Sequence, residues 1–139
     1  MTNLTAEAEA RFAYDHFATD VTGITIGEAG DHHAICHLQI DPTHCNAMGA
    51  VMGGAIFTLA DFAFAIAANS RSIKEYEPLE WVSVSSNIQY LRQARNGMLH
   101  AEAKCVKEGK STCVYSILVT DDQEREIALI TTTGMKVNI

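Results

Sequence analysis

Apolar residues recur at every second position in several stretches of this chain, which is the pattern of strands with one buried face. The first clear case begins at His33, and a shorter strand is predicted just before it, over residues 21–28. Four more strands are predicted after residue 80, joined as an antiparallel meander by turns that contain Gly97, Gly109 and Asp121. The residues predicted to share a face are Ala34, Cys36, Leu38 and Ile40; Val82, Val84, Ser86, Ile88 and Tyr90; Leu99, Ala101, Ala103 and Cys105; Cys113, Tyr115, Ile117 and Val119; and Ile127, Leu129, Thr131 and Thr133.

Two other stretches have the length and composition of helices, namely Thr5 to about Thr19 and Gly53 to about Asn69. Nearly every position of the second stretch is apolar, so this helix is predicted to be buried on most sides. A loop over residues 41–52 precedes it, and a linker over residues 71–80 follows it. One buried helix wrapped by a curved antiparallel sheet satisfies this order of elements. The sequence therefore predicts an α+β architecture of the hotdog type, as a single domain over residues 1–139.

Composition and charge exclude several classes of protein. The chain is 47% hydrophobic and carries a formal net charge of -7, so it lacks the excess of positive charge that nucleic-acid binding requires. No basic segment followed by an apolar stretch opens the sequence, so no signal peptide is predicted. The apolar stretch 53–68 is shorter than a bilayer crossing and carries Asp61 in its middle. Four cysteines without Cys-x-x-Cys spacing indicate free thiols, so we expect a cytoplasmic protein without a membrane or nucleic-acid partner.

The candidate chemistry lies where the loop meets the long helix. Gly53 and Gly54 stand at the predicted helix N-terminus, whose unpaired N–H groups suit a carbonyl oxygen that gains negative charge during acyl transfer. The alternative is that these glycines only allow close packing against the sheet. Asp61 follows two turns later, and because an unpartnered buried carboxylate is costly, a functional role is favoured over a packing role. The small or polar residues predicted to share one side of this helix are Gly54, Thr58, Asp61, Ala65 and Asn69.

The separation between these two features predicts how many chains build the site. Gly53 and Asp61 are eight residues apart, which is about 12 Å along a helix axis. That is too far for both to contact one reacting carbonyl. If both are catalytic, Asp61 must meet the N-terminus of the same helix in a second copy. Two such helices, antiparallel across a two-fold axis, would give a homodimer with two sites.

A specific motif surrounds these residues, with the form H-x-N-x-x-G-x-x-[H]-G-G-x-x-x-x-L-x-D. The residues that match it are His44, Asn46, Gly49, Gly53, Gly54, Leu59 and Asp61. With the strand segment 82–91, this motif resembles the PaaI-type, thioesterase superfamily member 2-like family of hotdog acyl-CoA thioesterases, over about residues 32–137. The resemblance implies hydrolysis of acyl-coenzyme A thioesters, with coenzyme A as part of the substrate and no separate cofactor. It also implies a homodimer or a dimer-of-dimers homotetramer.

The resemblance also implies roles for single residues. Asp61 would be the nucleophile or the general base that activates water, and the Gly53 amide would polarise the thioester carbonyl. Asn46 would orient the attacking water or the carboxylate, and Ser83 would help to hold that water. The residues expected to contact the substrate are His44, Met52 and Gly54.

One position departs from the family pattern, because the family usually has histidine where this chain has Met52. A thioether cannot donate the hydrogen bond that a histidine can, so rate and substrate preference are the properties expected to differ. The acyl group is predicted to be aryl or of medium length. The aromatic residues that would line its pocket, or else belong to the core, are Phe57, Phe62, Phe64, Trp81 and Tyr90.

Two other functions remain open. A hotdog hydratase or dehydratase is suggested by the segment 41–44, Asp-Pro-Thr-His, although the asparagine that precedes the proline in the hydratase motif is missing. A non-catalytic acyl-CoA-binding protein is suggested by Met52, since a lost catalytic side chain is typical of a binding module.

Three further groups of residues are weaker candidates. His32, His33, His37 and His44 suggest a metal site, but no carboxylate stands at ligand spacing, so no metal is predicted. Cys45 is unfavourable as a nucleophile paired with His44, because adjacent side chains rarely face each other. The residues that could meet the phosphates of coenzyme A, or else lie on a solvated sheet edge, are Arg92, Arg95, Lys104, Lys107 and Lys110.

Overall fold

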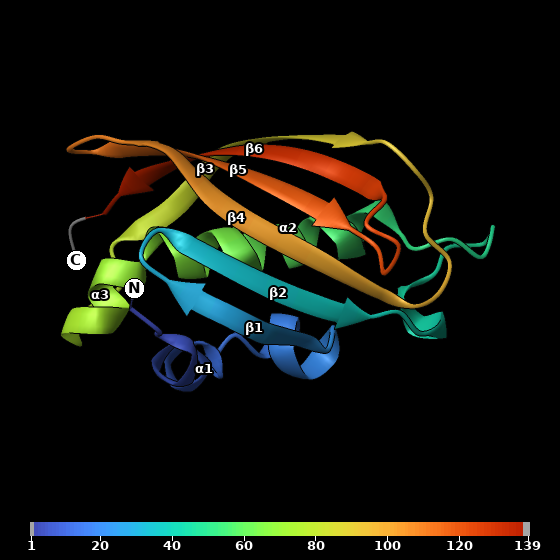
Figure 1. The fold of residues 1–139 in the computed structure, drawn as a ribbon, viewed down its shortest axis with the longest axis horizontal. Helices are drawn as coiled ribbons and strands as arrows, with labels where there is room; N and C mark the ends of the chain where they lie inside the picture. The colour runs from blue at the N-terminus through green and yellow to red at the C-terminus, as the bar shows by residue number, and fades with distance from the viewer. Residues whose placement is uncertain (1, 138–139) are drawn as a thin grey trace.

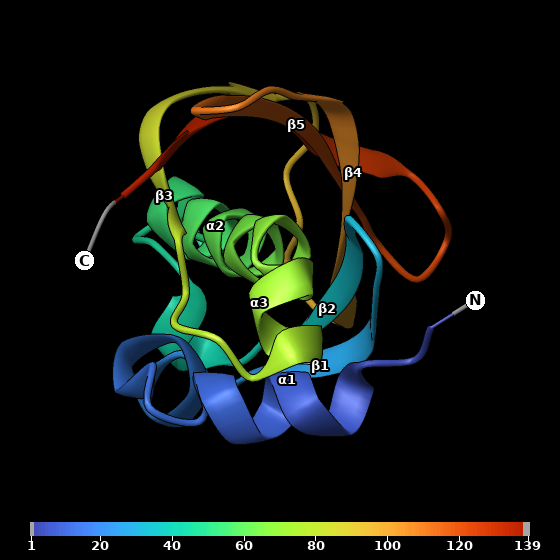
Figure 2. The same cartoon turned by 90° about the vertical axis from the view of Figure 1, so that its left-hand side faces the viewer.

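A single curved antiparallel sheet of six strands wraps around one long helix in the computed structural model, which describes residues 2–137 (Figures 1 and 2). The predicted hotdog architecture is therefore confirmed. The regular elements are α1 (Thr5–Phe12), β1 (Ile24–Gly30), β2 (His33–Gln39), α2 (Gly53–Ala68), α3 (Ser70–Glu75), β3 (Trp81–Tyr90), β4 (Met98–Glu108), β5 (Thr112–Thr120) and β6 (Glu126–Lys136). A π-helical turn η1 (Phe17–Val21) and a 3-10 turn η2 (Pro42–His44) complete them.

Helix α2 is the centre of the molecule, and the sheet arches over it (Figure 2). The strands can approach the helix closely because small residues occupy much of their inner face. The buried small residues on that face are Ala34, Ala101, Ala103, Ala128 and Gly134. The buried Tyr115 hydroxyl donates a hydrogen bond of 3.3 Å to the Ala67 carbonyl and ties β5 to the helix. None of the helices within residues 2–137 combines the length and apolar character needed to cross a bilayer.

The order of strands in the sheet is β1-β2-β4-β5-β6-β3. Only β4, β5 and β6 follow one another as the predicted meander, and the prediction that β3 belongs to it is wrong. Strand β3 pairs with β6 at the far edge of the sheet, so residues 91–97 carry the chain from that edge back to the middle. This crossover closes the sheet over α2 from the side that a simple meander would leave open.

A β-bulge changes which side chains of β3 face the helix. Strict alternation places Ser83 on the same face as Ser85, but the register shifts between these two residues. Ser83 therefore pairs with Gly134 on the inner face, while Ser85 pairs with Thr133. The bulge moves Ser83 to the side of the sheet on which α2 lies, as bulges near active sites commonly re-aim a side chain.

Leu129, Thr131 and Thr133 of β6 share a face as predicted, but it is the outer face of the sheet, while Ile127 is buried. The residues of β6 that are buried in a continuous alternating row are Ala128, Ile130, Thr132 and Gly134. Leu129 is exposed although it is more hydrophobic than its neighbour Ala128, which occupies the narrow space above α2. Thr132 tolerates burial because its hydroxyl lies 2.9 Å from the Ser86 hydroxyl. The hydrophobic pattern alone could not reveal this satisfied polar pair.

The N-terminal region differs from the prediction as well. Helix α1 ends at Phe12 instead of Thr19, because Ala8 and Phe12 are its buried residues and no apolar residue continues that row. The chain reverses in η1 and enters β1 at Ile24, three residues later than predicted. The predicted linker over 71–80 also includes most of the short helix α3. The segment between α1 and β1 is thus free to lie beside α2.

We expect Gly134→Ala to destabilise the fold. A β-carbon at this position would lie 2.7 Å from the Cys113 sulfur and 2.8 Å from a ring carbon of Phe64. Overpacking of a core of this kind lowers the free energy of unfolding by about 1–3 kcal/mol, measurable by urea denaturation. Gly54→Ala is the matched control, because a β-carbon there has open space around it. Equal free energies of unfolding for the two variants would contradict this. They would show that the sheet can move away from α2 without a loss of stability.

Candidate active site

Asp61 is the one ionisable side chain of α2, and it lies on the side of the helix that the sheet leaves uncovered. It lines a hollow of about 340 Å³ together with Thr58, Phe62 and Ala65 of the same helix. The opposite wall comes from residues 15–18, the segment that follows α1. The predicted small and polar side of α2 is therefore a groove wall.

The electrostatic setting of Asp61 favours a proton-accepting role. Burial raises the pKa of the Asp61 carboxyl above its ordinary value, a hydrogen bond with the Ser83 side chain lowers it in part, and the nearby negative charge of Asp15 raises it further. The carboxyl of Asp15 has a raised pKa of its own, chiefly because it is partly buried. A carboxylate whose pKa is raised toward neutrality is a better general base than a fully solvated one.

The N-terminus of α2 presents free backbone donors. Met52 is the N-cap, and its carbonyl accepts from the amides of Ala55 and Ile56. Within residues 2–137, the amides of Gly53 and Gly54 have no hydrogen-bond acceptor. Free N–H groups at a helix N-terminus attract negative charge, so this end can hold an oxyanion.

Glycine at position 53 allows a close side-chain contact that the sequence did not disclose. The Tyr90 hydroxyl donates a hydrogen bond of 3.0 Å to the Gly53 carbonyl. A β-carbon at position 53 would lie 2.7 Å from that hydroxyl oxygen. Both residues line a hollow of about 410 Å³, which Arg92 also borders. The glycine therefore allows close approach of a side chain from β3.

The loop before α2 is held together by Asn46. Its side-chain oxygen accepts hydrogen bonds from the amides of Met48 (2.9 Å) and Ala50 (3.2 Å). No partner within residues 2–137 contacts its side-chain NH₂ group, which leaves this donor for a water or a ligand. The predicted role of Asn46 in orienting water stays a prediction.

His44 is a buried anchor of the same loop. One ring nitrogen, Nδ1, accepts from the Asp41 amide (3.0 Å), and Nε2 lies 2.7 Å from the Thr22 carbonyl, to which it donates. Both ring nitrogens are therefore engaged in hydrogen bonds. The predicted contact with substrate can involve only the ring carbons. The Cys45 thiol donates to the Asp41 carbonyl, which removes the basis for a Cys45–His44 nucleophile pair.

The predicted site residues thus fall into two groups on one chain. Asp61, in the middle of α2, and Ser83 of β3 lie beside each other. The second group, at the helix N-terminus, contains His44, Asn46, Met52, Gly53 and Gly54. His44, Met52 and Gly54 border the same hollow, of about 450 Å³.

Some predicted members of the site lie elsewhere. Asn69 is buried, and its side chain joins the end of α2 to the start of β3 through hydrogen bonds with Ala65, Glu80 and Trp81. Three of the five aromatic candidates belong to the buried core. They are Phe62, Phe64 and Trp81, of which Phe62 also borders the hollow beside Asp61. The sequence analysis did not predict Phe17 and Asp15 as residues near the site, because the predicted helix included both. The available signal was that the row of buried helix residues ends at Phe12.

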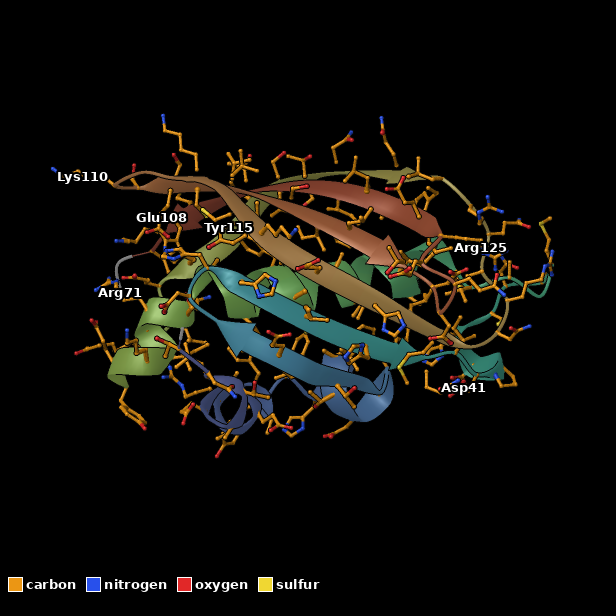
Figure 3. The ribbon with its side chains drawn as sticks, in the orientation of Figure 1. Asp41, Arg71, Glu108, Lys110, Tyr115 and Arg125 are labelled. Atoms are coloured by element: carbon orange, nitrogen blue, oxygen red, sulfur yellow. The ribbon has the colours of Figure 1, made fainter. Side chains whose placement is uncertain are left out.

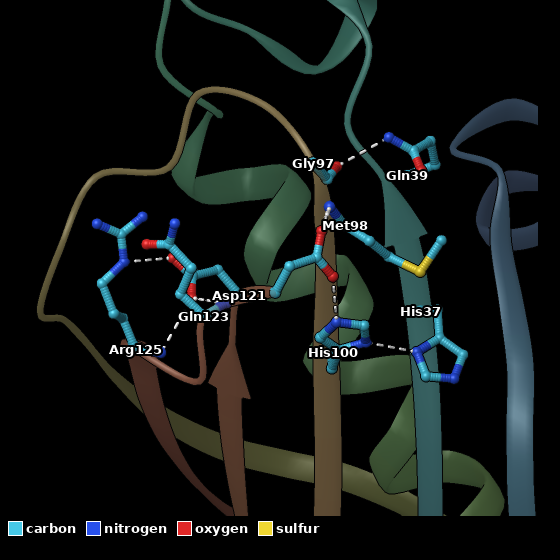
Figure 4. A network of polar contacts seen from close by, with 9 residues as sticks. His37, Gln39, Gly97, Met98, His100, Asp121, Gln123 and Arg125 are labelled. Atoms are coloured by element: carbon cyan, nitrogen blue, oxygen red, sulfur yellow. Dashed lines mark hydrogen bonds and ion pairs between the residues drawn. The ribbon is translucent and has the colours of Figure 1, made fainter.

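The surface histidines are engaged in hydrogen bonds on the outer face of the sheet. His37 and His100 lie opposite each other on β2 and β4, with their Nδ1 atoms 2.8 Å apart, and His100 Nε2 lies 2.9 Å from Asp122 (Figure 4). His33 Nε2 lies 2.6 Å from Glu102. In the part of the chain that the structure describes, no group of three or more His, Cys, Asp or Glu side chains is arranged to hold a metal ion.

The basic candidates are spread over the molecule. Arg92 borders the hollow beside Gly53, and Arg95 donates a 2.8 Å hydrogen bond to the Met48 carbonyl. Lys110 lies at the end of the sheet far from Asp41 and the loop that precedes α2 (Figure 3). Arg92 and Arg95 are therefore two candidates with an observed position beside the helix N-terminus or the loop before it.

Comparison with known proteins agrees with this geometry. The thioesterase superfamily matches residues 48–128. The chain is 32% identical to the acyl-coenzyme A thioesterase PaaI of Escherichia coli over 77% of its own length and 73% of that protein, and 30% identical to acyl-coenzyme A thioesterase 13 of Pongo abelii over 70% and 68%. The solved structure of E. coli PaaI has a TM-score of 0.83 at 27% identity, covering 97% of this chain and 96% of that one. The chain belongs to the thioesterase superfamily.

Within that superfamily, the chain is of the PaaI type and is a thioester hydrolase, as its motif predicted.

The paired histidines lead to a prediction about stability and pH. Burial, and secondarily the positive charge of His100, lowers the pKa of His37 below its ordinary value. The unfolded chain therefore binds a proton at His37 before the folded chain does, and stability falls as the pH drops below about 6.5 until the folded pKa is passed. His37→Gln should therefore lose less stability than the wild type between pH 7.5 and 5.5, measured as the free energy of unfolding in urea. Parallel pH profiles for the two proteins would contradict this.

Proposed function

We propose that this thioester hydrolase cleaves acyl-coenzyme A with an aryl or medium-chain acyl group, using Asp61 as nucleophile or general base. The observation that carries the proposal is a partly buried carboxylate with a raised pKa, contacted by Ser83, on the one open side of an otherwise apolar helix. The relatives named as acyl-coenzyme A thioesterases support coenzyme A as the thiol portion. Arg92, beside Gly53, offers a positive charge to the phosphates of coenzyme A.

In the general-base route, Asp61 takes a proton from a water held by Ser83, and the resulting hydroxide attacks the thioester carbonyl. The oxygen that becomes negative is bound by the Gly53 amide. Collapse of the intermediate breaks the carbon–sulfur bond and releases coenzyme A, whose sulfur takes up a proton, and the free acid. In the nucleophilic route, a carboxylate oxygen of Asp61 attacks the thioester carbonyl, the carbon–sulfur bond breaks, and coenzyme A leaves as a thiolate that takes up a proton. Water then hydrolyses the mixed anhydride, which releases the free acid and restores the Asp61 carboxylate.

The two groups of site residues would meet across a two-fold axis. Asp61 and Gly53 stand about 12 Å apart along one helix, so they do not reach one carbonyl within a chain. Strand β3 also has an unpaired outer edge, with Val82 and Val84 exposed, and such an edge invites pairing with a second strand. A homodimer that covers this edge would bring Gly53 of one chain to Asp61 of the other.

Met52 then borders the substrate in place of the usual histidine. It is half exposed, and its flexible thioether suits an irregular apolar surface. Catalysis would therefore rest on Asp61, Ser83 and the helix N-terminus, without a histidine donor at the N-cap.

Substitution of Asp61 tests the assignment. Asp61→Ala and Asp61→Asn should each lower kcat on acyl-CoA about a hundredfold or more, because neither side chain accepts a proton or attacks as a carboxylate does. Coenzyme A release is measured with a thiol reagent. In the wild type, kcat/KM should fall as the pH drops through the raised pKa of Asp61. Asp31→Asn, at an exposed position, is the control. Wild-type kcat in Asp61→Ala would rule the assignment out.

Mixing two inactive variants tests the shared site. Gly53→Pro removes the proposed donor, but the new ring would strike Tyr90, so it is made together with Tyr90→Ala, and Tyr90→Ala alone is the control. The double variant and Asp61→Ala should each be nearly inactive. Remixed, they should recover at most about a quarter of wild-type activity, since half of the dimers are mixed and one of their two sites is intact.

Tagged pull-down shows whether mixed dimers form. Mixed dimers without activity would mean that Gly53 and Asp61 do not act together across the two-fold axis. Activity loss in Tyr90→Ala alone would assign the defect to the tyrosine.

A further inference from the structure

The first turn of α2 carries its free donors on two consecutive glycines. Gly53 and Gly54 are the first two residues of the helix, and their amides meet no hydrogen-bond acceptor within residues 2–137. Glycine has no side chain to restrict its backbone, so a helix that begins with two glycines has a loosely held first turn. Donors for an oxyanion must be fixed before the reaction, because any reorientation during it costs part of the energy that they supply. This turn therefore needs a contact from outside the glycines to hold it.

The side chain of Tyr90 makes such a contact. Its hydroxyl donates a hydrogen bond of 3.0 Å to the Gly53 carbonyl. Its ring also lies against the glycine, because a β-carbon at position 53 would be 2.8 Å from the ring carbon Cζ. The tyrosine thus restrains both the carbonyl and the Cα of the first helical residue.

The neighbouring carbonyls are held in a different way. The Met52 carbonyl accepts from two amides of the first turn, and the Gly54 carbonyl accepts a hydrogen bond of 2.8 Å from the Thr58 hydroxyl. These donors belong to α2 itself and move with it. Among the described residues, Tyr90 is the one that ties this turn to another element, because it stands on β3.

Tyr90 itself stands on a rigid support. It is the last residue of β3 and pairs with Ala128 of β6. The two amides that follow it, those of Leu91 and Arg92, donate to the Ile127 carbonyl over 2.8 and 3.3 Å. The backbone is therefore fixed on both sides of the tyrosine, and a site residue held by a strand is positioned more accurately than one on a loop.

The contact also changes the strength of a donor. The Gly53 carbonyl and the Gly54 N–H belong to the same peptide group. A carbonyl that accepts a hydrogen bond polarises its peptide group, so the N–H of that group becomes a stronger donor. The Gly53 N–H belongs to the preceding peptide group, and its direction depends on the Gly53 backbone that the tyrosine ring covers.

We propose that Tyr90 is a positioning residue for thioester hydrolysis, which aims the Gly53 and Gly54 amides at the carbonyl oxygen and makes Gly54 a second donor to it. The inference rests on the proposed function, because it takes these amides as the oxyanion donors. Tyr90 acts through the Gly53 carbonyl and does not contact the reacting atoms. In the proposed dimer, it belongs to the chain that supplies the donors, while Asp61 belongs to the other chain.

Tyr115 offers a matched comparison. It also stands on a strand and donates to a carbonyl of α2, that of Ala67, over 3.3 Å. That carbonyl lies near the opposite end of the helix, away from the free amides. If Tyr90 only fastens the sheet to α2, loss of either hydroxyl should affect stability and not the reaction.

The test compares Tyr90→Phe with Tyr115→Phe, each of which removes only a hydroxyl. With the best acyl-CoA substrate of the wild type, Tyr90→Phe should lower kcat about tenfold and leave KM within about twofold, because the donors act on the transition state. Tyr115→Phe should leave kcat unchanged and lower the urea midpoint. Wild-type kcat in Tyr90→Phe would overturn the inference. Since the expected loss is partial, Tyr90→Ala in the mixing experiment should keep part of its activity.

Nuclear magnetic resonance separates this inference from the proposed function, because it needs no substrate. The backbone order parameters of Gly53 and Gly54 should fall in Tyr90→Phe and stay unchanged in Tyr115→Phe. A fall supports the hold on these amides even if the wild type hydrolyses no acyl-CoA, in which case the proposed function alone fails. Unchanged order parameters together with a lower kcat would mean that the hydroxyl acts on the substrate directly, which would overturn the inference.

Discussion

The whole structure depends on covering one helix that is apolar on nearly every side. Helix α2 cannot be satisfied by one flat sheet face, so the strands curve around it and the small residues of their inner face let them come close. The curvature requires β3 to reach the far edge beside β6. The strip of α2 that the sheet leaves open is the place where a carboxylate can stay hydrated enough to react. Core and active site are thus two sides of one helix.

Much of this arrangement follows from residue pattern alone. Period-two alternation predicted β2, β4 and β5 with their correct inner faces, because apolar residues stand at every second position of each strand. The apolar run from Gly53 predicted α2 within one residue of its end. The motif around Asp61 predicted the family, because the glycines and the carboxylate stand at the spacing that the proposed chemistry requires.

Other features could not be predicted, because they arise from pairings between distant segments. The position of β3 depends on its contact with β6, and the inward turn of Ser83 depends on a bulge that periodicity cannot reveal. Thr132 can be buried because its hydroxyl pairs with that of Ser86. From the sequence, a polar residue at this position of β6 suggests the outer face instead. Phe17 was hidden for the opposite reason, since a run of good helix formers extended the predicted helix beyond its last buried residue.

The contact between Tyr90 and Gly53 links two positions that are 37 residues apart in the chain. The tyrosine occupies the space in which any larger residue at position 53 would need to place its β-carbon. A lineage that replaced the glycine would have to move the tyrosine side chain or make it smaller, and one that made the aromatic residue smaller would release the glycine from part of its constraint. The two positions are therefore expected to change together during evolution, even though one belongs to a helix and the other to the edge of the sheet.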